Sequence, residues 1–122
     1  MAMVNVASCF FRNGRQAECE AWHLRIIADN PENPMGWSRH ATYIAMGASD
    51  DDPEPLLRAL DISATAVGKA RTWRAWLRWV LADRCRIAAD AKRFDIVEAA
   101  MVEILDDWPC KCEIDVPFFE WD

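Results

Sequence analysis

The sequence contains little of the material that makes turns, with 4 Gly and 6 Pro among 122 residues. Many short strands joined by tight turns need more of both residues, so the composition favours helices. A hydrophobic fraction of 52% is enough for a core and argues against a disordered chain. The length is that of one domain.

Long apolar runs and targeting signals are also missing. No stretch reaches the roughly 18 to 20 apolar residues that span a bilayer. The first apolar stretch, residues 1–11, lacks the basic region and the small-residue cleavage site of a secretory signal. Together with five Cys, an odd number, these absences predict a cytoplasmic protein with reduced thiols and no membrane contact.

Catalytic motifs are absent as well: there is no Gly-rich phosphate loop, no HExxH, no GxSxG and no GxGxxG. His23 and His40 both fall on predicted packed helix faces. A structural histidine is the better interpretation there than a base that activates Cys9 or Cys19. We therefore expect a protein that is not an enzyme and has no cofactor.

What is present is apolar spacing typical of helices, interrupted by Pro and Gly. Six helices are expected, over residues 3–11, 15–29, 34–47, 52 or 53 to 69, 72–90 and 95–107. The connections between them are short, which places successive helices antiparallel. The sequence thus predicts an all-α fold of about three antiparallel hairpins.

The segment from residue 14 to residue 47 carries large and small residues at a repeat-like spacing. Trp37 stands at the start of a helix, Ala41 is a small residue one turn later, and Pro31 closes the preceding helix. At these positions the segment resembles the tetratricopeptide repeat (TPR). The resemblance implies a right-handed stack of helical hairpins that binds a partner protein. We assign residues 1–109 to this domain and expect residues 110–122 to form a separate, irregular tail.

Residues 71–86 combine tryptophan with arginine. Drawn as one continuous helix, the segment puts Trp73 and Trp76 on the core arc, with Trp79 at its border beside a row of arginines. An aromatic side chain next to arginine makes a good anchor for a partner, and arginine binds carboxylates through forked hydrogen bonds. The candidate partner-binding residues on the helices are Trp37, Arg71, Arg74, Arg78 and Trp79.

The net charge of -6 conceals a strong division of charge along the chain. Residues 69–93 hold eight Lys or Arg against two Asp, whereas residues 94–122 hold one Lys against nine Asp or Glu. One interpretation is that the acidic sixth helix packs beside the basic fifth; the other is that the arginines bind an acidic peptide. Because acidic segments flank the basic one, a nucleic-acid partner is disfavoured.

The predicted tail is rich in aromatic and acidic residues. It either packs over the open end of the helical stack or serves as a docking peptide for a partner. Its candidate partner-binding residues are Phe118, Phe119 and Trp121.

A zinc site is a weaker hypothesis. Cys19 and His23 stand four residues apart on one helix face, and Cys110 and Cys112 could complete a tetrahedral set of ligands. Since CxC is not a standard zinc-knuckle spacing, no bound metal is expected.

Two functions from different classes remain open. The first is a non-enzymatic scaffold or adaptor that binds a partner segment through a surface lined by Trp and Arg. The alternative is a small acidic inhibitor or nucleic-acid mimic, encoded by a virus or mobile element, that blocks a host nucleic-acid-handling protein; a pI near 4.9 fits it. Salt-sensitive binding to a basic enzyme would distinguish the second from the first.

Overall fold

A computed structural model describes residues 2–106 of the chain, with side chains from Val6 onward. Over that range the protein contains six α-helices, one short 3-10 helix and no strand. The helices are α1 (Ala2–Arg12), α2 (Gln16–Asp29), α3 (Pro34–Ala45), α4 (Glu54–Arg71), η1 (Arg74–Trp76), α5 (Leu77–Asp90) and α6 (Phe94–Asp106). The predicted all-α fold with six helices is confirmed. None of the helices described is long and apolar enough to cross a membrane.

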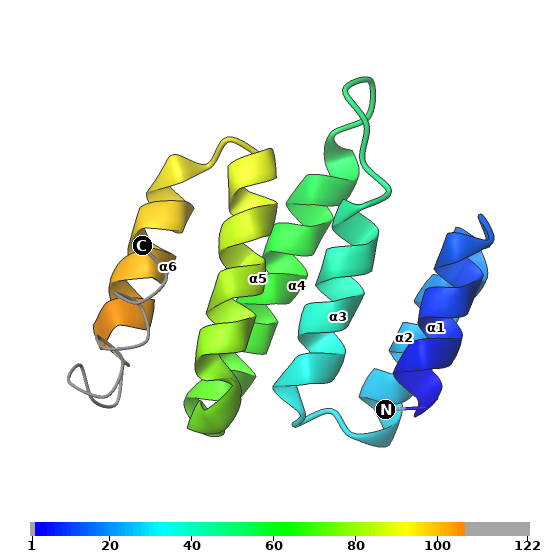
Figure 1. Ribbon diagram of the computed structural model, residues 1–122, viewed down its shortest axis with the longest axis horizontal. Coiled ribbons are helices and arrows are strands. Elements are labelled where there is room, and N and C mark those ends of the chain that lie inside the picture. The colour runs from blue at the N-terminus through cyan, green and yellow to red at the C-terminus, as the bar shows by residue number, and fades with distance from the viewer. Residues whose placement is uncertain (1, 107–122) are drawn as a thin grey trace, which may run out of the picture.

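The helices lie side by side in chain order (Figure 1), from α6 on the left through α5, α4 and α3 to the pair α1 and α2 on the right. The most extensive packing joins α3 to α4, α5 to α6 and α1 to α2, and α4 also packs against α5. Helices that are neighbours in the sequence therefore pack against each other. No repeat can be assigned from this packing, and the resemblance to TPR proteins stays a prediction.

Local sequence explains several helix ends. Gly14 adopts a φ of +75°, a conformation that glycine tolerates far better than other residues, and it ends the turn after α1. Asn33 caps α3, because its side-chain oxygen accepts a hydrogen bond of 2.9 Å from the Met35 backbone N–H. Pro34 occupies the first turn of α3, where no intrahelical N–H is needed.

The core consists of two apolar clusters. The first joins α4, α5 and α6 through Ala66, Val67, Ala70, Leu77, Val80, Leu81 and Ala100. The second joins α3, α4 and α5 through Ala41, Ile44, Ala59, Leu60, Ile87 and Ala88. Because both clusters include residues of α4 and α5, these two helices are the centre of the fold.

The predicted helix over residues 72–90 is wrong in its first turn. α4 continues to Arg71, the chain then reverses, and α5 begins only at Leu77. Trp73, with φ -133° and ψ 68°, is not helical. Trp73 and Trp76 were predicted to belong to the core, yet 44% and 37% of their surface is exposed. The prediction that these two side chains are buried is wrong because it assumed one continuous helix. The chain turns between Arg71 and Leu77, and neither Gly nor Pro marks that turn in the sequence.

From Leu77 onward the predicted arc is correct. Its apolar members are buried in the structure: Leu77, Val80, Leu81 and Ile87.

Candidate functional site

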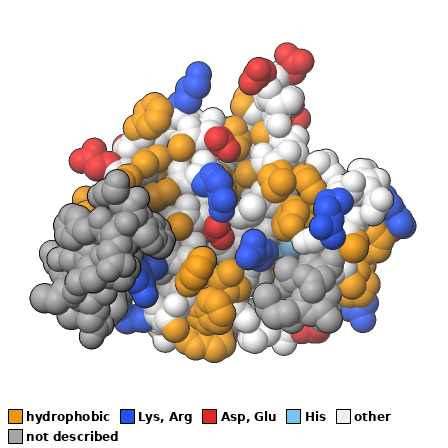
Figure 2. All heavy atoms as spheres, in the orientation of Figure 1, with side chains coloured by type: hydrophobic (Ala, Val, Ile, Leu, Met, Phe, Trp, Pro, Cys, Tyr) orange, Lys and Arg blue, Asp and Glu red, His pale blue; other side chains and the backbone are white. Residues whose placement is uncertain are grey.

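Three tryptophans gather at the start of α5. Trp73, Trp76 and Trp79 lie within seven residues, and all three are exposed, Trp79 by 66%. In Figure 1 α5 begins at the lower end of the molecule, and Figure 2, in the same orientation, shows hydrophobic side chains there. Large apolar side chains that cluster on a surface mark binding sites more often than scattered ones do. We call Trp73, Arg74, Trp76, Arg78 and Trp79 the Trp/Arg surface.

A cavity adjoins this surface between α5 and α6. Its volume is about 290 Å³, and it is lined by Arg78, Trp79 and Ala82 of α5 and by Ile104 of α6. The walls are mainly apolar, while Arg78 supplies a cation at the border. This combination can accept an apolar side chain and, beside it, a carboxylate that the guanidinium binds in a forked geometry.

Arg71 has a different place from the one predicted. It ends α4, and its guanidinium donates to both carboxylate oxygens of Glu103 on α6, at 2.8 and 3.0 Å. This ion pair joins the basic segment to α6 through α4 rather than through α5. The fifth helix itself also packs against α6, as the first interpretation of the charge division expected. Since both side chains are partly exposed, the pair contributes at most about 1 kcal/mol to stability.

Trp37 lies on α3 and is half-buried. Its indole N–H donates to the carbonyl oxygen of Pro31 at 2.8 Å, and its ring packs against the first core cluster. It is not among the described residues that line the cavity beside Trp79. The structure therefore gives Trp37 a role in the turn before α3. The predicted tail residues Phe118, Phe119 and Trp121 lie outside the described part of the chain.

Sequence reasoning overlooked Arg84. Its guanidinium is half-buried and donates to the Leu60 carbonyl at 2.8 Å and to the Ser63 hydroxyl at 2.6 Å, which ties α5 to α4. Burial lowers the pKa of Arg84 from its usual value. A signal was available: Arg84 falls on the apolar arc of its helix rather than with the other arginines.

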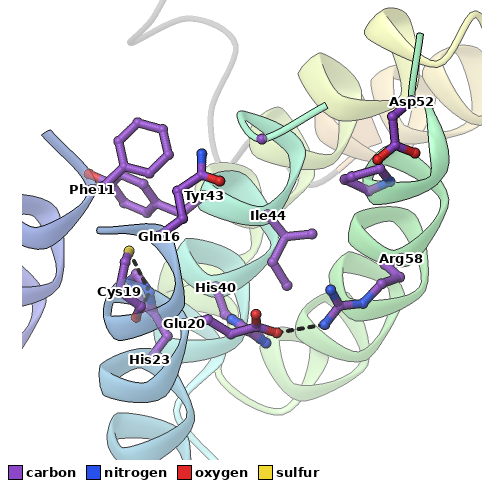
Figure 3. Close-up of a pocket in the computed structure, with 12 residues that line it drawn as sticks. Phe11, Gln16, Cys19, Glu20, His23, His40, Tyr43, Ile44, Asp52 and Arg58 are labelled. Atoms are coloured by element: carbon purple, nitrogen blue, oxygen red, sulfur yellow. Dashed lines mark hydrogen bonds and ion pairs between the residues drawn. The ribbon is translucent and has the colours of Figure 1, made fainter. Parts of the chain in front are cut away.

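A second candidate site is the cavity of about 240 Å³ between the N-terminal helices. Figure 3 shows side chains from α1, α2, α3 and the start of α4 around it, with the Glu20–Arg58 ion pair at one side. His23 and His40 are almost fully buried beside it, and their ring centroids lie 5.9 Å apart. Their predicted placement on packed faces is confirmed. We call this site the histidine pocket.

The histidine pocket brings a thiol close to an imidazole. Nδ1 of His23 donates to the Cys19 carbonyl at 3.0 Å and lies 3.6 Å from the Cys19 sulfur. Burial lowers the pKa of His23 to about 4 and raises the pKa of the Cys19 thiol. At neutral pH both groups are therefore uncharged, which is the opposite of the thiolate and imidazolium that nucleophilic catalysis requires.

Two ring nitrogens in this pocket are buried without a hydrogen-bond partner among the described residues, Nε2 of His23 and Nδ1 of His40. Within the same part of the chain, no three His, Cys, Asp or Glu side chains are placed to hold a metal ion. Of the four predicted zinc ligands the structure brings Cys19 and His23 together, while Cys110 and Cys112 lie outside the described residues.

Thiol reactivity tests this description of the pocket. Under native conditions we expect iodoacetamide to alkylate the exposed Cys9 and to leave the buried Cys19 unmodified. Mass spectrometry of the digested protein measures both sites, and alkylation after unfolding in urea is the control that both can react. Rapid native labelling of Cys19 would contradict the assignment of an inert thiol.

No protein-family model, curated protein or solved structure matches the chain. An assignment of function therefore rests on the chemistry of the Trp/Arg surface and of the histidine pocket.

Proposed function

We propose that the protein is a non-enzymatic interaction module that binds a segment of a partner protein through the Trp/Arg surface. The observation that carries this proposal is the exposure of three tryptophans within seven residues. Tryptophan is among the residues that contribute most to binding when a partner removes them from water. Three exposed tryptophans so close together in the chain favour an interface over a purely structural role.

The cavity beside Trp79 indicates the chemistry of the partner segment. An apolar side chain of the partner would fill the space between Trp79 and Ile104, and a neighbouring carboxylate would bind Arg78. A peptide with an aromatic or aliphatic residue next to an acidic one has both features. The uncharged state of Cys19 and His23 supports a binding role over a catalytic one.

Selection of displayed peptides on the full chain tests the proposal. Peptides that are enriched should lose affinity for the Trp79→Ala variant by about 30-fold or more, the effect of removing a central aromatic anchor. The separate Arg78→Glu variant should also lose affinity, most of all for the acidic peptides. Leu57→Ala is the matched control, because Leu57 is 55% exposed but lies on α4, away from the cavity. Fluorescence anisotropy with labelled peptides gives the dissociation constants.

Equal affinity for the native chain, Trp79→Ala and Arg78→Glu would contradict the proposal. Salt-sensitive binding to a basic nucleic-acid-handling enzyme, with no dependence on Trp79, would favour the acidic inhibitor instead.

A further inference from the structure

The last described helix ends beside the cavity. Ile104, which lines the cavity, precedes the final residue of α6, Asp106, by two positions. The described part of α6 therefore ends at the edge of the cavity.

The length of the connecting chain allows a return to that cavity. Residues 107–115 can span roughly 30 Å when extended, at about 3.3 Å per residue. α6 has 13 residues and is roughly 20 Å long, at 1.5 Å per residue. Residues 116–122 are therefore within reach of every part of the α5–α6 face.

The chemistry of this segment complements the cavity. Residues 116–122 read VPFFEWD, with three aromatic side chains interleaved with two carboxylates. The cavity offers mainly apolar walls and the guanidinium of Arg78. We infer that residues 116–122 bind in the α5–α6 cavity of their own chain and cover the Trp/Arg surface.

The outer face of α6 is the competing location, and its charge argues against it. Phe94, Met101 and Leu105 form an exposed apolar stripe there, at positions i, i+7 and i+11. Glu98 lies within the same stripe, and an acidic segment would be repelled by it. The basic border of the cavity is the better match for carboxylates.

Occupancy by the chain's own segment has a consequence that rests on the proposed function. A tethered segment competes at an effective concentration in the millimolar range, so a partner peptide must displace it. The segment thereby acts as an autoinhibitory element, and partners with a stronger anchor than the native segment are selected.

Photo-crosslinking in the full chain tests the location directly. Benzoylphenylalanine replaces Phe118, the protein is irradiated, and mass spectrometry identifies the attachment site. We expect crosslinks to residues 73–82 or to Ile104 of the same molecule. Arg78→Glu should lower the crosslink yield several-fold. Arg25→Glu, which reverses an exposed arginine on α2, is the matched control and should not.

Irradiation of a mixture of 14N and 15N protein separates the chain's own segment from that of a second copy. Crosslinks that join the two isotopic forms, crosslinks to α1 or α2, or a yield insensitive to Arg78→Glu would each overturn the inference. Because this experiment needs no partner, its failure is distinct from failure of the peptide-binding test. If the chain binds peptides at the Trp/Arg surface and residues 116–122 occupy the same cavity, replacing Phe118, Phe119 and Trp121 by Ser should raise peptide affinity by at least about 10-fold.

Discussion

The Leu81→Ala variant is expected to lose about 2–5 kcal/mol of its free energy of unfolding. Leu81 is fully buried in the first core cluster, where α5 packs against α4 and α6. Truncation removes three carbon atoms from close-packed surroundings and leaves a cavity that the helices only partly fill. Domains of this size are stable by about 5–15 kcal/mol, so the loss is a large share of the total.

Urea denaturation followed by far-ultraviolet circular dichroism measures this loss. Leu57→Ala is again the control, since the same truncation at a site that is 55% exposed should cost well under half as much. Similar losses for the two variants would show that Leu81 is not a core residue and that α5 is packed differently.

Acidification from pH 7 to pH 4 should cost the protein about 3 kcal/mol through His23 alone. Burial lowers the pKa of His23 from 6.5 to about 4, so the folded state prefers the neutral imidazole, whereas the unfolded state binds a proton. The stabilising contribution is complete above pH 6.5 and is lost as the pH falls towards 4. Each pKa unit of difference corresponds to about 1.4 kcal/mol. Burial also lowers the pKa of His40, which adds to the loss in the same direction.

The free energy of unfolding, measured by urea titration at intervals between pH 7 and pH 4, checks this prediction. His23→Gln is the matched variant, because it keeps a side-chain N–H donor for the Cys19 carbonyl but cannot titrate. We expect a much flatter pH profile for it over the same interval. A native profile that is flat between pH 6.5 and pH 4, or an unchanged slope in His23→Gln, would contradict a neutral, buried His23.

Most helix ends could be predicted because particular residues mark them. Gly14 supplies a left-handed conformation, and Asn33 with Pro34 begins α3. The turn at residues 72–76 has no such marker, and its position is decided by the packing of α4 against α5. A continuous helix drawn through that turn therefore places Trp73 and Trp76 in the core, which is wrong. The exposure of Trp79 could be predicted, because this residue lies at the edge of the apolar arc.

The candidate sites were harder to predict than the helices. Placement of His23 and His40 on packed faces follows from apolar spacing, but their approach to each other depends on how α2 meets α3. The cavity beside Trp79 likewise depends on which side of α5 receives Ile104. Such contacts between helices leave no local pattern in the sequence.

The two apolar clusters stabilise α3 to α6 directly, whereas α1 and α2 lie outside both of them. Neither apolar cluster contains a residue of α1 or α2, and these two helices pack mainly on each other and on α3. Polar links such as Glu20–Arg58 and Glu32–Lys69 connect this pair and its following turn to α4. Amide hydrogens of α1 and α2 can therefore exchange with solvent through a partial opening that leaves α4 and α5 intact, whereas exchange in the centre of α5 requires unfolding of the whole domain.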